Sequence, residues 1–540
     1  MHPARYCLLG CAGLFYLACT PTTPPPDPTP EPSFCDRQGW SERAFDSMGP
    51  FGILRRDLAA DFTVPTTTGD WHLAEQFTGC ESYVFVPDNL YVSPLDPTPL
   101  VNSAEDLAEL IEKSPRNTHY FFVSMSQDSG RVDTLVSGMT ERIEQVLSEL
   151  SGAQRNWWSE RLHVIDTSAL RLRDWVRDSM TSTGSGFAID RFQRIRGFGG
   201  LADVTRFDQG LDNAGAWPWR ANLSYLANEV RYYNYESDRD DMLAEHDWTV
   251  VTLWDNERFG GNAYTSVTLP DPATMAGFDT MLVDATYNCR QDQQELGNCG
   301  PWDYRSAFYL CDVEDPDSCN TELARYITTY HREARWIPDA SHMLVHLKGG
   351  GERRFRFDPS SQSYDMTVRI LLSNRGKGSA PYAADYLWAG GGGFGSGYDA
   401  NHPPIEVDVP ADAQRVYLYA NITGHGQGGN YNCAEFCAHQ HDFAVDGPGG
   451  TQTFSADHPM VGDNLGCVDQ IDIGTVPNQN GTWWFGRGGW CPGKQVDPWV
   501  WDVSDLVTAG QPATFSYTTN GGLPYEGGNI WMHSWLVYWK

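Results

Sequence analysis

The chain has 540 residues and carries 38 Lys and Arg against 70 Asp and Glu, a net charge of −32. This charge argues against nucleic acid or an anionic membrane surface as the main partner, because both repel an acidic protein. The 20 Trp, 25 Tyr and 53 Gly favour a strand-rich and loop-rich protein, and the length predicts about three domains.

The first 19 residues have the pattern of a bacterial export signal. Arg5 precedes an uncharged run, Cys7–Ala18, which is too short to span a bilayer. The run ends in Leu17-Ala18-Cys19, which resembles a lipobox, so we expect Cys19 to carry lipid and residues 20–33, rich in proline, to form a tether. An ordinary secretory signal with a free Cys19 is the alternative. We therefore expect a monomeric, lipid-anchored protein of the bacterial cell envelope, at the outer membrane or cell surface, or released from it.

The cysteines support export. Of 13 cysteines, Cys7 and Cys11 leave with the signal and Cys19 is reserved for lipid, which leaves an even number for disulfides in an oxidising compartment. No CxxC pair occurs, so a cysteine-based zinc site is not expected. Grouping along the chain favours the pairs Cys35–Cys80, Cys289–Cys299, Cys311–Cys319, Cys433–Cys437 and Cys467–Cys491.

Residues 34–245 alternate between strand and helix patterns. Strand patterns occupy Tyr83–Val86, His119–Met125 and Leu162–Ile165, and a hairpin is expected from Phe187–Asp190 and Arg194–Arg196. Helical spacing occupies Ala104–Lys113, Val132–Leu150 and Leu170–Met180. Such alternation predicts a central sheet covered by helices.

Three short segments of this region resemble the framing segments of thioredoxin-like redoxin domains: Asp61–Pro65, Gly69–Leu73 and Ile189–Arg191. In that family the reactive cysteine follows the strand equivalent to Tyr83–Val86, where this chain has Pro87–Leu90 and no thiol. The resemblance therefore implies a thioredoxin-like fold without redox cysteines, acting as a spacer or docking module.

Residues 246–540 show short strands separated by turn residues, which predicts all-β sandwiches or jelly rolls. We place a first jelly roll at 246–380 and a second at 381–540, with Gly390–Gly393 in a flexible loop near the boundary. The clearest strand patterns are Thr249–Leu253, Thr280–Val283, Arg354–Phe357, Thr367–Leu372, Arg415–Ala420 and Asn529–Tyr538.

One segment of the second β region combines cysteines, a carboxylate and imidazoles. Cys433 and Cys437, one helical turn apart, are close enough for a disulfide and would hold the backbone of Glu435 still. A fixed carboxylate near His439 and His441 suggests a catalytic site. The alternative is a purely structural disulfide beside a surface glutamate.

Two motifs around this segment, Cys433–Cys437 and Arg487–Gly493, together closely resemble the second domain of the peptide-N-glycosidase F family. Cys299–Asp303 resembles the disulfide loop and Trp-Asp of the first domain of that family. The resemblance covers residues 248–540. It implies two adjacent jelly rolls, with a site in the cleft between them that hydrolyses the amide joining asparagine to N-acetylglucosamine in N-glycoproteins or glycopeptides, without a cofactor.

The resemblance also implies roles for individual residues. Asp303 matches the catalytic aspartate, Glu435 a glutamate that reaches the substrate through water, and Arg487 an arginine of the same cleft. The remaining candidates for binding substrate are the aromatic residues Trp302, Trp490 and Trp483, and also Arg305, Asp358 and His425. Tyr304 stands where the family has arginine, and Gly424–Gly426 replaces a tryptophan-bearing loop.

Two other functions are compatible with the sequence. The paired jelly rolls also resemble copper-dependent peptide monooxygenases, and His425, His439 and His441 are candidates for a metal site of that kind. The second alternative is a non-catalytic, glycan-binding lipoprotein that has lost its hydrolytic activity. The presence of both Asp303 and Glu435 favours an enzyme, because binding alone needs neither acid.

Overall fold

A computed structural model of the chain describes residues 34–88, 104–183, 186–197, 217–289, 299–360, 362–426, 433–479, 481–519 and 526–540. The expected signal, Cys19 and the tether lie outside these residues. The chain divides into two units, Met1–Ser41 and Glu42–Lys540. In the first, the structure describes the short helix α1 (Phe34–Gln38). The other elements belong to the second unit. No described helix has the length and apolar character needed to cross a membrane.

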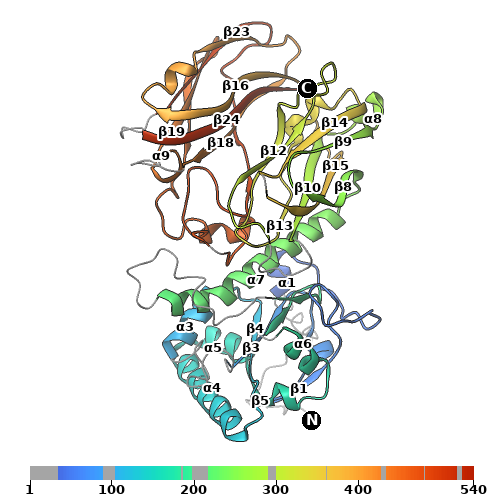
Figure 1. The fold of residues 1–540 in the computed structure, drawn as a ribbon, viewed down its shortest axis with the longest axis vertical. Coiled ribbons are helices and arrows are strands. Elements are labelled where there is room, and N and C mark those ends of the chain that lie inside the picture. Colours follow the sequence, from blue (N-terminus) through green and yellow to red (C-terminus); the bar gives the residue numbers. More distant parts are fainter. Residues whose placement is uncertain are drawn as a thin grey trace, which may run out of the picture. The chain divides into compact units, whose positions relative to one another are not determined.

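The N-terminal part of the second unit is a seven-stranded sheet in the order β2-β1-β5-β4-β3-β6-β7, with helices beside it (Figure 1). Its central strands β3, β4 and β5 are parallel, and β6 and β7 form the expected antiparallel hairpin. The strands are β1 (Thr63–Thr66), β2 (Gly69–His72), β3 (Ser82–Pro87), β4 (Thr118–Ser124), β5 (Leu162–Ser168), β6 (Phe187–Ile189) and β7 (Ile195–Arg196). The helices are α2 (Leu73–Gln76), α3 (Ala104–Lys113), α4 (Ser129–Glu149), α5 (Gly152–Ser159), η1 (Ala169–Arg171), α6 (Trp175–Thr183) and α7 (Trp217–Ala244).

This α/β architecture agrees with the strand–helix alternation of the sequence, and its assignment to the thioredoxin-like fold stays a prediction. β3 is followed by Asp88, whose buried carboxylate accepts hydrogen bonds from the Ser124 hydroxyl and the Met125 amide. Cys80 lies just before β3, and its pairing with Cys35 also stays a prediction. The four other expected disulfides form: Cys289–Cys299, Cys311–Cys319, Cys433–Cys437 and Cys467–Cys491.

The next part is a β-sandwich of two antiparallel sheets, β13-β10-β15-β8 and β21-β12-β11-β14-β9. In β15, Tyr364, Met366, Val368 and Ile370 are buried while the residues between them are partly exposed, as expected for a strand with one face in a core. The elements are β8 (Thr249–Phe259), β9 (Ala263–Leu269), α8 (Pro272–Ala276), β10 (Thr280–Asn288), β11 (Arg305–Leu310), β12 (Thr321–Ile327), β13 (Ala334–Trp336), η3 (Ser341–His346), β14 (Gly351–Asp358), β15 (Tyr364–Ser373) and β21 (Gln495–Val496).

The last part is a second sandwich, with sheets β16-β24-β18-β22 and β17-β23-β19-β20. Gly390–Gly393 lies inside β16, so the expectation of a flexible loop was wrong: these glycines pair with Asn529–Met532 of β24. The neighbouring Trp531 ring fills the space that a side chain at Gly391 would need. The elements are β16 (Pro381–Gly395), η4 (Asp399–Asn401), β17 (Ile405–Asp408), β18 (Arg415–His425), α9 (Cys433–Phe436), β19 (Gln440–Gly447), β20 (Gly450–Asp457), η5 (Val468–Ile473), β22 (Trp499–Asp502), β23 (Pro512–Thr519) and β24 (Glu526–Trp539).

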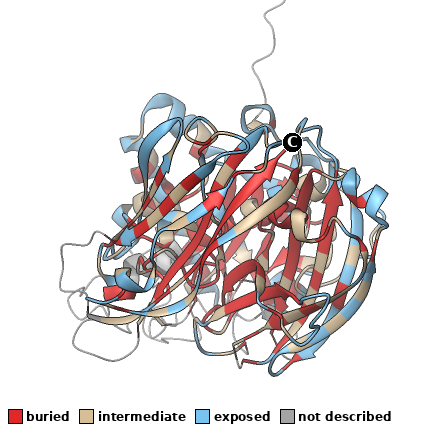
Figure 2. Cartoon of the chain, turned by 90° about the horizontal axis from the view of Figure 1, so that it is seen from above, coloured by how far each residue is buried: buried red, intermediate tan, exposed pale blue. Residues whose placement is uncertain are grey.

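The two sandwiches pack through one sheet of each. Tyr419, Trp535 and Trp539 of the second sandwich join the aromatic core of the first. Arg325 on β12 is fully buried and donates to the Thr423 hydroxyl at 2.8 Å and to the Trp531 carbonyl at 2.9 Å. Seen from above, buried residues gather on the strands of both sandwiches, and many of the peripheral segments are exposed (Figure 2). The shared core fixes the two sandwiches against each other.

Helix α7 connects the α/β part to both sandwiches. Arg332 donates to Glu229 of α7 at 2.8 Å, and Asn478, in the loop after η5, donates to the same carboxylate at 2.7 Å.

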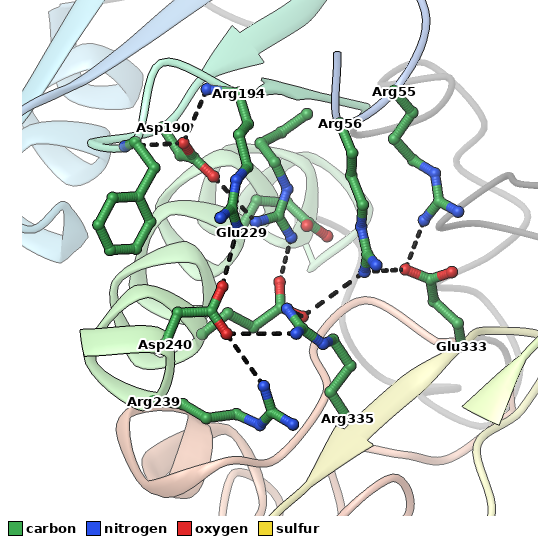
Figure 3. Close-up of polar contacts among 12 residues, drawn as sticks. Arg55, Arg56, Asp190, Arg194, Glu229, Arg239, Asp240, Glu333 and Arg335 are labelled. Atoms are coloured by element: carbon green, nitrogen blue, oxygen red, sulfur yellow. Dashed lines mark hydrogen bonds and ion pairs between the residues drawn. The ribbon is translucent and has the colours of Figure 1, made fainter. Parts of the chain in front are cut away.

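A larger ionic network lies beside this contact (Figure 3). In it Asp240 of α7 meets Arg194 at 2.8 Å and Arg335 at 3.2 Å, while Glu333 meets Arg55 and Arg56. The network thus joins the α/β sheet, α7 and the first sandwich.

Candidate active site

Asp303 lies in a turn that side chains hold on both sides. The Thr328 hydroxyl donates to the Trp302 carbonyl at 2.6 Å and accepts from the Tyr304 amide at 2.8 Å. The Gln362 side chain accepts from the Trp302 amide at 3.0 Å and donates to its carbonyl at 2.7 Å. Because both neighbours of Asp303 are tied down, its side chain projects from a backbone with little freedom.

Glu435 lies on α9, which the Cys433–Cys437 disulfide closes. Its carbonyl accepts from the Gly488 amide at 2.8 Å, and its carboxylate Oε2 accepts from the Gly426 amide at 2.7 Å. Three contacts therefore hold this glutamate: the disulfide around it, the backbone beside it, and an amide that binds its carboxylate.

Glycines allow the backbones at this site to approach closely. A Cβ atom on Gly424 would lie 1.6 Å from the Ala434 carbonyl oxygen, and one on Gly488 would lie 2.4 Å from the same oxygen. The Gly424 amide donates to the Gly488 carbonyl at 2.8 Å. Larger residues would push α9 away from β18 and from the loop that carries Arg487.

The Arg487 guanidinium joins the two acids. Its Nη2 lies 3.2 Å from Asp303 Oδ2, and its Nε lies 3.2 Å from Glu435 Oε1. Nη1 donates to the carbonyls of Thr482 at 3.1 Å and Phe485 at 2.8 Å, which orient the group. The arginine side chain is 1% exposed, whereas those of Asp303 and Glu435 keep 16% and 11% exposure. One buried cation thus holds two carboxylates, from different sandwiches, that solvent still reaches.

Burial raises the pKa of both acids. It raises the pKa of Glu435 from 4.5 to about 7, although the Gly426 amide and Arg487 oppose this change. It also raises the pKa of Asp303, against the lowering effect of Arg487 and of a hydrogen bond from Tyr330. Near neutral pH, Glu435 therefore exchanges a proton readily, as an acid–base group must.

The predicted aromatic residues differ in exposure. Trp302, beside Asp303, is 53% exposed, whereas Trp483 and Trp490 are buried. The Trp490 ring packs 4.9 Å from the Arg487 guanidinium and stacks on His425 with ring centroids 5.0 Å apart. Of these three rings, only that of Trp302 is exposed.

Arg305 and Asp358 form a separate polar group. Their charged groups lie 3.8 Å apart, and the Arg305 guanidinium lies 4.1 Å above the Trp531 ring. Arg305 also donates to the Tyr309 hydroxyl at 2.9 Å. These contacts hold Arg305 against the second sandwich rather than against Arg487.

Tyr330 and Thr482 complete the site and were not predicted. The Tyr330 hydroxyl lies 3.4 Å from Arg487 Nη2 and hydrogen-bonds Asp303, and the Thr482 hydroxyl accepts from the same nitrogen at 3.0 Å. Neither residue belongs to a motif, and Tyr330 meets Arg487 from 157 positions away in the sequence, so no local pattern could identify it.

The histidines gather differently from the expectation. Among the described residues, His439, His441 and His458 form a buried group in which each ring offers one nitrogen, and these three nitrogens lie within 4.8 Å of one another. His425 is outside this group and pairs with the Thr423 hydroxyl at 2.9 Å. His458 is 17 positions after His441 and carried no spacing signal.

Comparisons with known proteins bear on the second sandwich in particular. Residues 395–537 match the family described as Peptide-N-glycosidase F, C terminal. The chain is 30% identical over 117 residues to peptide-N(4)-(N-acetyl-beta-D-glucosaminyl)asparagine amidase F of Elizabethkingia miricola. This match spans 21% of the chain and only 29% of that relative. Neither alternative function, copper-dependent monooxygenase or decayed glycan binder, is favoured by these matches.

Solved structures are similar over about half of the chain. PNGase F of Flavobacterium meningosepticum, described as a glycosylasparaginase, aligns at 17% identity and a TM-score of 0.44, over 54% of this chain and 96% of that one. A protein described as PNGF-II aligns at 13% identity and a TM-score of 0.39, over 56% of this chain and 67% of that one.

Proposed function

We propose that this chain, which belongs to the peptide-N-glycosidase F family through its residues 395–537, is an amidase that releases N-glycans by cleaving the bond between asparagine and N-acetylglucosamine. Its substrates would be N-glycosylated proteins or glycopeptides. The observation that carries this proposal is the bridge from Arg487 to Asp303 and Glu435, because it brings together two acids from different sandwiches.

The chemistry of amide hydrolysis suits this arrangement. Water adds its oxygen to the amide carbon of the asparagine side chain, the carbon–nitrogen bond breaks, and a proton goes to the departing glycosylamine nitrogen. Asp303, held next to the guanidinium, takes the proton from water. Glu435, whose pKa of about 7 leaves it partly protonated at neutral pH, supplies a proton to the nitrogen. Arg487 stabilises the negative charge that develops between them.

The surroundings of the two acids support a sugar substrate. Trp302 is adjacent to Asp303 and presents an exposed ring, on which a pyranose can stack, and Tyr304 on the other side is 38% exposed. We assign Trp302 to the sugar nearest the scissile amide. Arg305 and Asp358 lie further along β11 and β14 and are proposed to contact more distant parts of the substrate.

The test is conversion of asparagine to aspartate. The full-length protein is incubated with a glycoprotein in heavy-oxygen water, and mass spectrometry looks for peptides that have lost the glycan and gained the label. Asp303→Asn removes the base without changing the shape of the side chain and should lower the rate by about 100-fold or more. Asp315→Asn, at an exposed acid of the same sandwich, is the matched control and should keep full activity.

Labelled aspartate from wild type and from Asp315→Asn, but not from Asp303→Asn, is the expected result. An active Asp303→Asn would contradict the assignment of the base. A wild type that retains glycopeptides on a column yet converts none would show a glycan-binding protein instead.

We also propose that Cys19 anchors the protein to the bacterial envelope. The support is the lipobox-like Leu17-Ala18-Cys19 followed by the proline-rich residues 20–33. Cys19→Ser should move the protein from the membrane fraction to the soluble fraction, and an unchanged distribution would contradict the anchor.

A further inference from the structure

Three buried histidine rings pack against the backbone segments that carry Glu435 and Arg487. His439 immediately precedes β19, His441 is the second residue of β19, and His458 follows β20. All three are at most 6% exposed, and their ring centroids lie 4.8 to 5.6 Å apart. The predicted strand spacing puts His439 and His441 on one face, and pairing of β19 with β20 brings His458 to them.

The hydrogen bonds of this group do not include a buried ring nitrogen of His458. His458 Nε2 is buried and has no hydrogen-bond partner among the described residues. A buried polar atom without a partner is costly and calls for an explanation. No such atom occurs on His439 or His441, whose ring nitrogens form a continuous chain.

The hydrogen bonds of His439 and His441 are compatible with metal binding, because each ring can donate from one nitrogen and keep a lone pair on the other. His439 Nε2 lies 2.8 Å from the Ala434 carbonyl and therefore donates, so its Nδ1 carries a lone pair, 2.9 Å from His441 Nε2. His441 Nδ1 lies 2.5 Å from the Tyr517 hydroxyl. If His441 carries its proton on Nδ1 and donates to Tyr517, its Nε2 also presents a lone pair, and no charge has changed. Tyr517 can then donate to the Tyr398 hydroxyl, 3.5 Å away.

The distances between the ring nitrogens need only modest changes, in which the 2.9 Å contact of His439 with His441 lengthens and the wider separations shorten. Zinc–imidazole bonds of about 2.0–2.1 Å at tetrahedral angles put nitrogens roughly 3.3 Å apart. The three nitrogens here lie within 4.8 Å of one another, so an ion between them requires only small ring movements. Metal-bound histidines usually donate their second N–H to a carbonyl or another polar oxygen, and Ala434 and Tyr517 provide these acceptors.

We propose that His439, His441 and His458 bind one first-row transition metal ion, Zn²⁺ or Cu²⁺, in a buried structural site. Imidazole ligands suit both ions. This site departs from the expectation of a metal-free protein and differs from the predicted set, because His458 replaces His425. It stands apart from the proposed amidase activity, which needs no metal.

The position of the site gives it a mechanical role. The Ala434 carbonyl that accepts from His439 immediately precedes Glu435. On the other side, a Cβ atom on Gly488 would lie 3.0 Å from His439 Nε2, and one on Gly489 would lie 2.8 Å from the His458 ring. The imidazoles thus support the backbone of Glu435 and the turn that follows Arg487. An ion that fixes the three rings would fix both segments.

Metal titration of the full-length protein, purified without a histidine tag and stripped with a chelator, tests the site. Zn²⁺ is titrated against a chromophoric competitor and Cu²⁺ by its visible absorption, and each should bind once per chain, with the tighter ion identified by competition. His458→Gln should weaken binding by about 100-fold or more, and Tyr517→Phe, which removes the oxygen behind His441, by about tenfold. The control is His402→Gln, whose ring lies 5.2 Å from that of Tyr517 but outside the group, and it should bind as wild type does.

Hydrogen exchange provides a readout of the mechanical role. Peptides covering 433–441 and 485–491 should exchange more slowly with metal than without it in the wild type, and equally in His458→Gln. Stoichiometric binding that His458→Gln loses and His402→Gln keeps supports the site. Absence of stoichiometric binding of either ion to the wild type overturns it, whatever the folding of the variants. Unchanged affinity in a folded His458→Gln, checked by melting, also overturns it.

Discussion

Replacing Glu435 by glutamine isolates the contribution of this one carboxyl group to the pH dependence of the free energy of unfolding. In the folded state burial raises the pKa of this carboxyl from 4.5 to about 7, whereas in the unfolded chain it keeps its ordinary value. Between these values the folded protein holds a proton that the unfolded chain has released. The contribution of this proton to the free energy of unfolding is therefore fully present below about pH 4.5 and is lost as the pH rises through about 7. One pKa unit corresponds to about 1.4 kcal/mol, so the loss amounts to roughly 3 kcal/mol.

Glutamine has the same shape and does not titrate, and its oxygen can still accept from the Gly426 amide. The free energy of unfolding of the wild type, measured relative to that of Glu435→Gln, should therefore fall by roughly 3 kcal/mol between about pH 4.5 and 7.5. Urea unfolding followed by tryptophan fluorescence gives the global value, and hydrogen exchange of peptides covering 433–437 gives the local one. Glu406→Gln, at an exposed glutamate of β17 in the same sandwich, should show no such change. A wild-type-to-variant difference that is independent of pH, or that changes in the opposite direction, would refute the account of a buried, neutral-preferring carboxyl.

Three further changes test how the site is held. Arg487→Met leaves two largely buried acids without their cation and should lower the free energy of unfolding at neutral pH by roughly 3–5 kcal/mol in urea titrations, and a loss below about 1 kcal/mol would contradict the bridge. Gly424→Ala places a methyl group 1.6 Å from a carbonyl oxygen and should cost about 1–3 kcal/mol, whereas Gly397→Ala, with open space around it, should melt like the wild type. Replacing both Cys433 and Cys437 by serine should cost only about 2 kcal/mol because the loop is short, yet lower amidase turnover more than this loss of stability explains. Equal turnover in the folded serine variant would show that the disulfide does not position Glu435.

The sequence pattern was informative where one face of a strand packs into a core. Thr367–Leu372 is predicted as one of the short strands between turn residues, and it lies within β15, whose N-terminal residues are alternately buried and partly exposed. Gly390–Gly393 was misjudged because glycine normally weakens a strand. Pairing along β24 and the Trp531 ring compensate for the missing side chains, and both come from residues about 140 positions away. Such compensation is invisible to a local pattern.

In the candidate site too, some residues could be predicted from sequence motifs and others could not. Asp303, Glu435 and Arg487 were identified through motifs, and the structure brings all three into contact. Tyr330 and His458 belong to no motif, and they reach their partners only through the packing of loops and the pairing of strands. The sequence therefore indicated the charged groups, whereas the residues that orient or surround them required coordinates.

The ionic contacts of α7 have a consequence for how the protein can be divided. A fragment beginning at residue 246 would retain Arg332 and Glu333 but lose Glu229, Arg55 and Arg56, which neutralise them. Arg332 and Glu333 would then remain as isolated charges on a surface that had been covered, next to the segment through Asn478 that leads to Arg487. A fragment that keeps these contacts should thus begin before Arg55, so that it retains both arginines and α7. In this sense the N-terminal half supports the two sandwiches and cannot be removed without exposing buried charges.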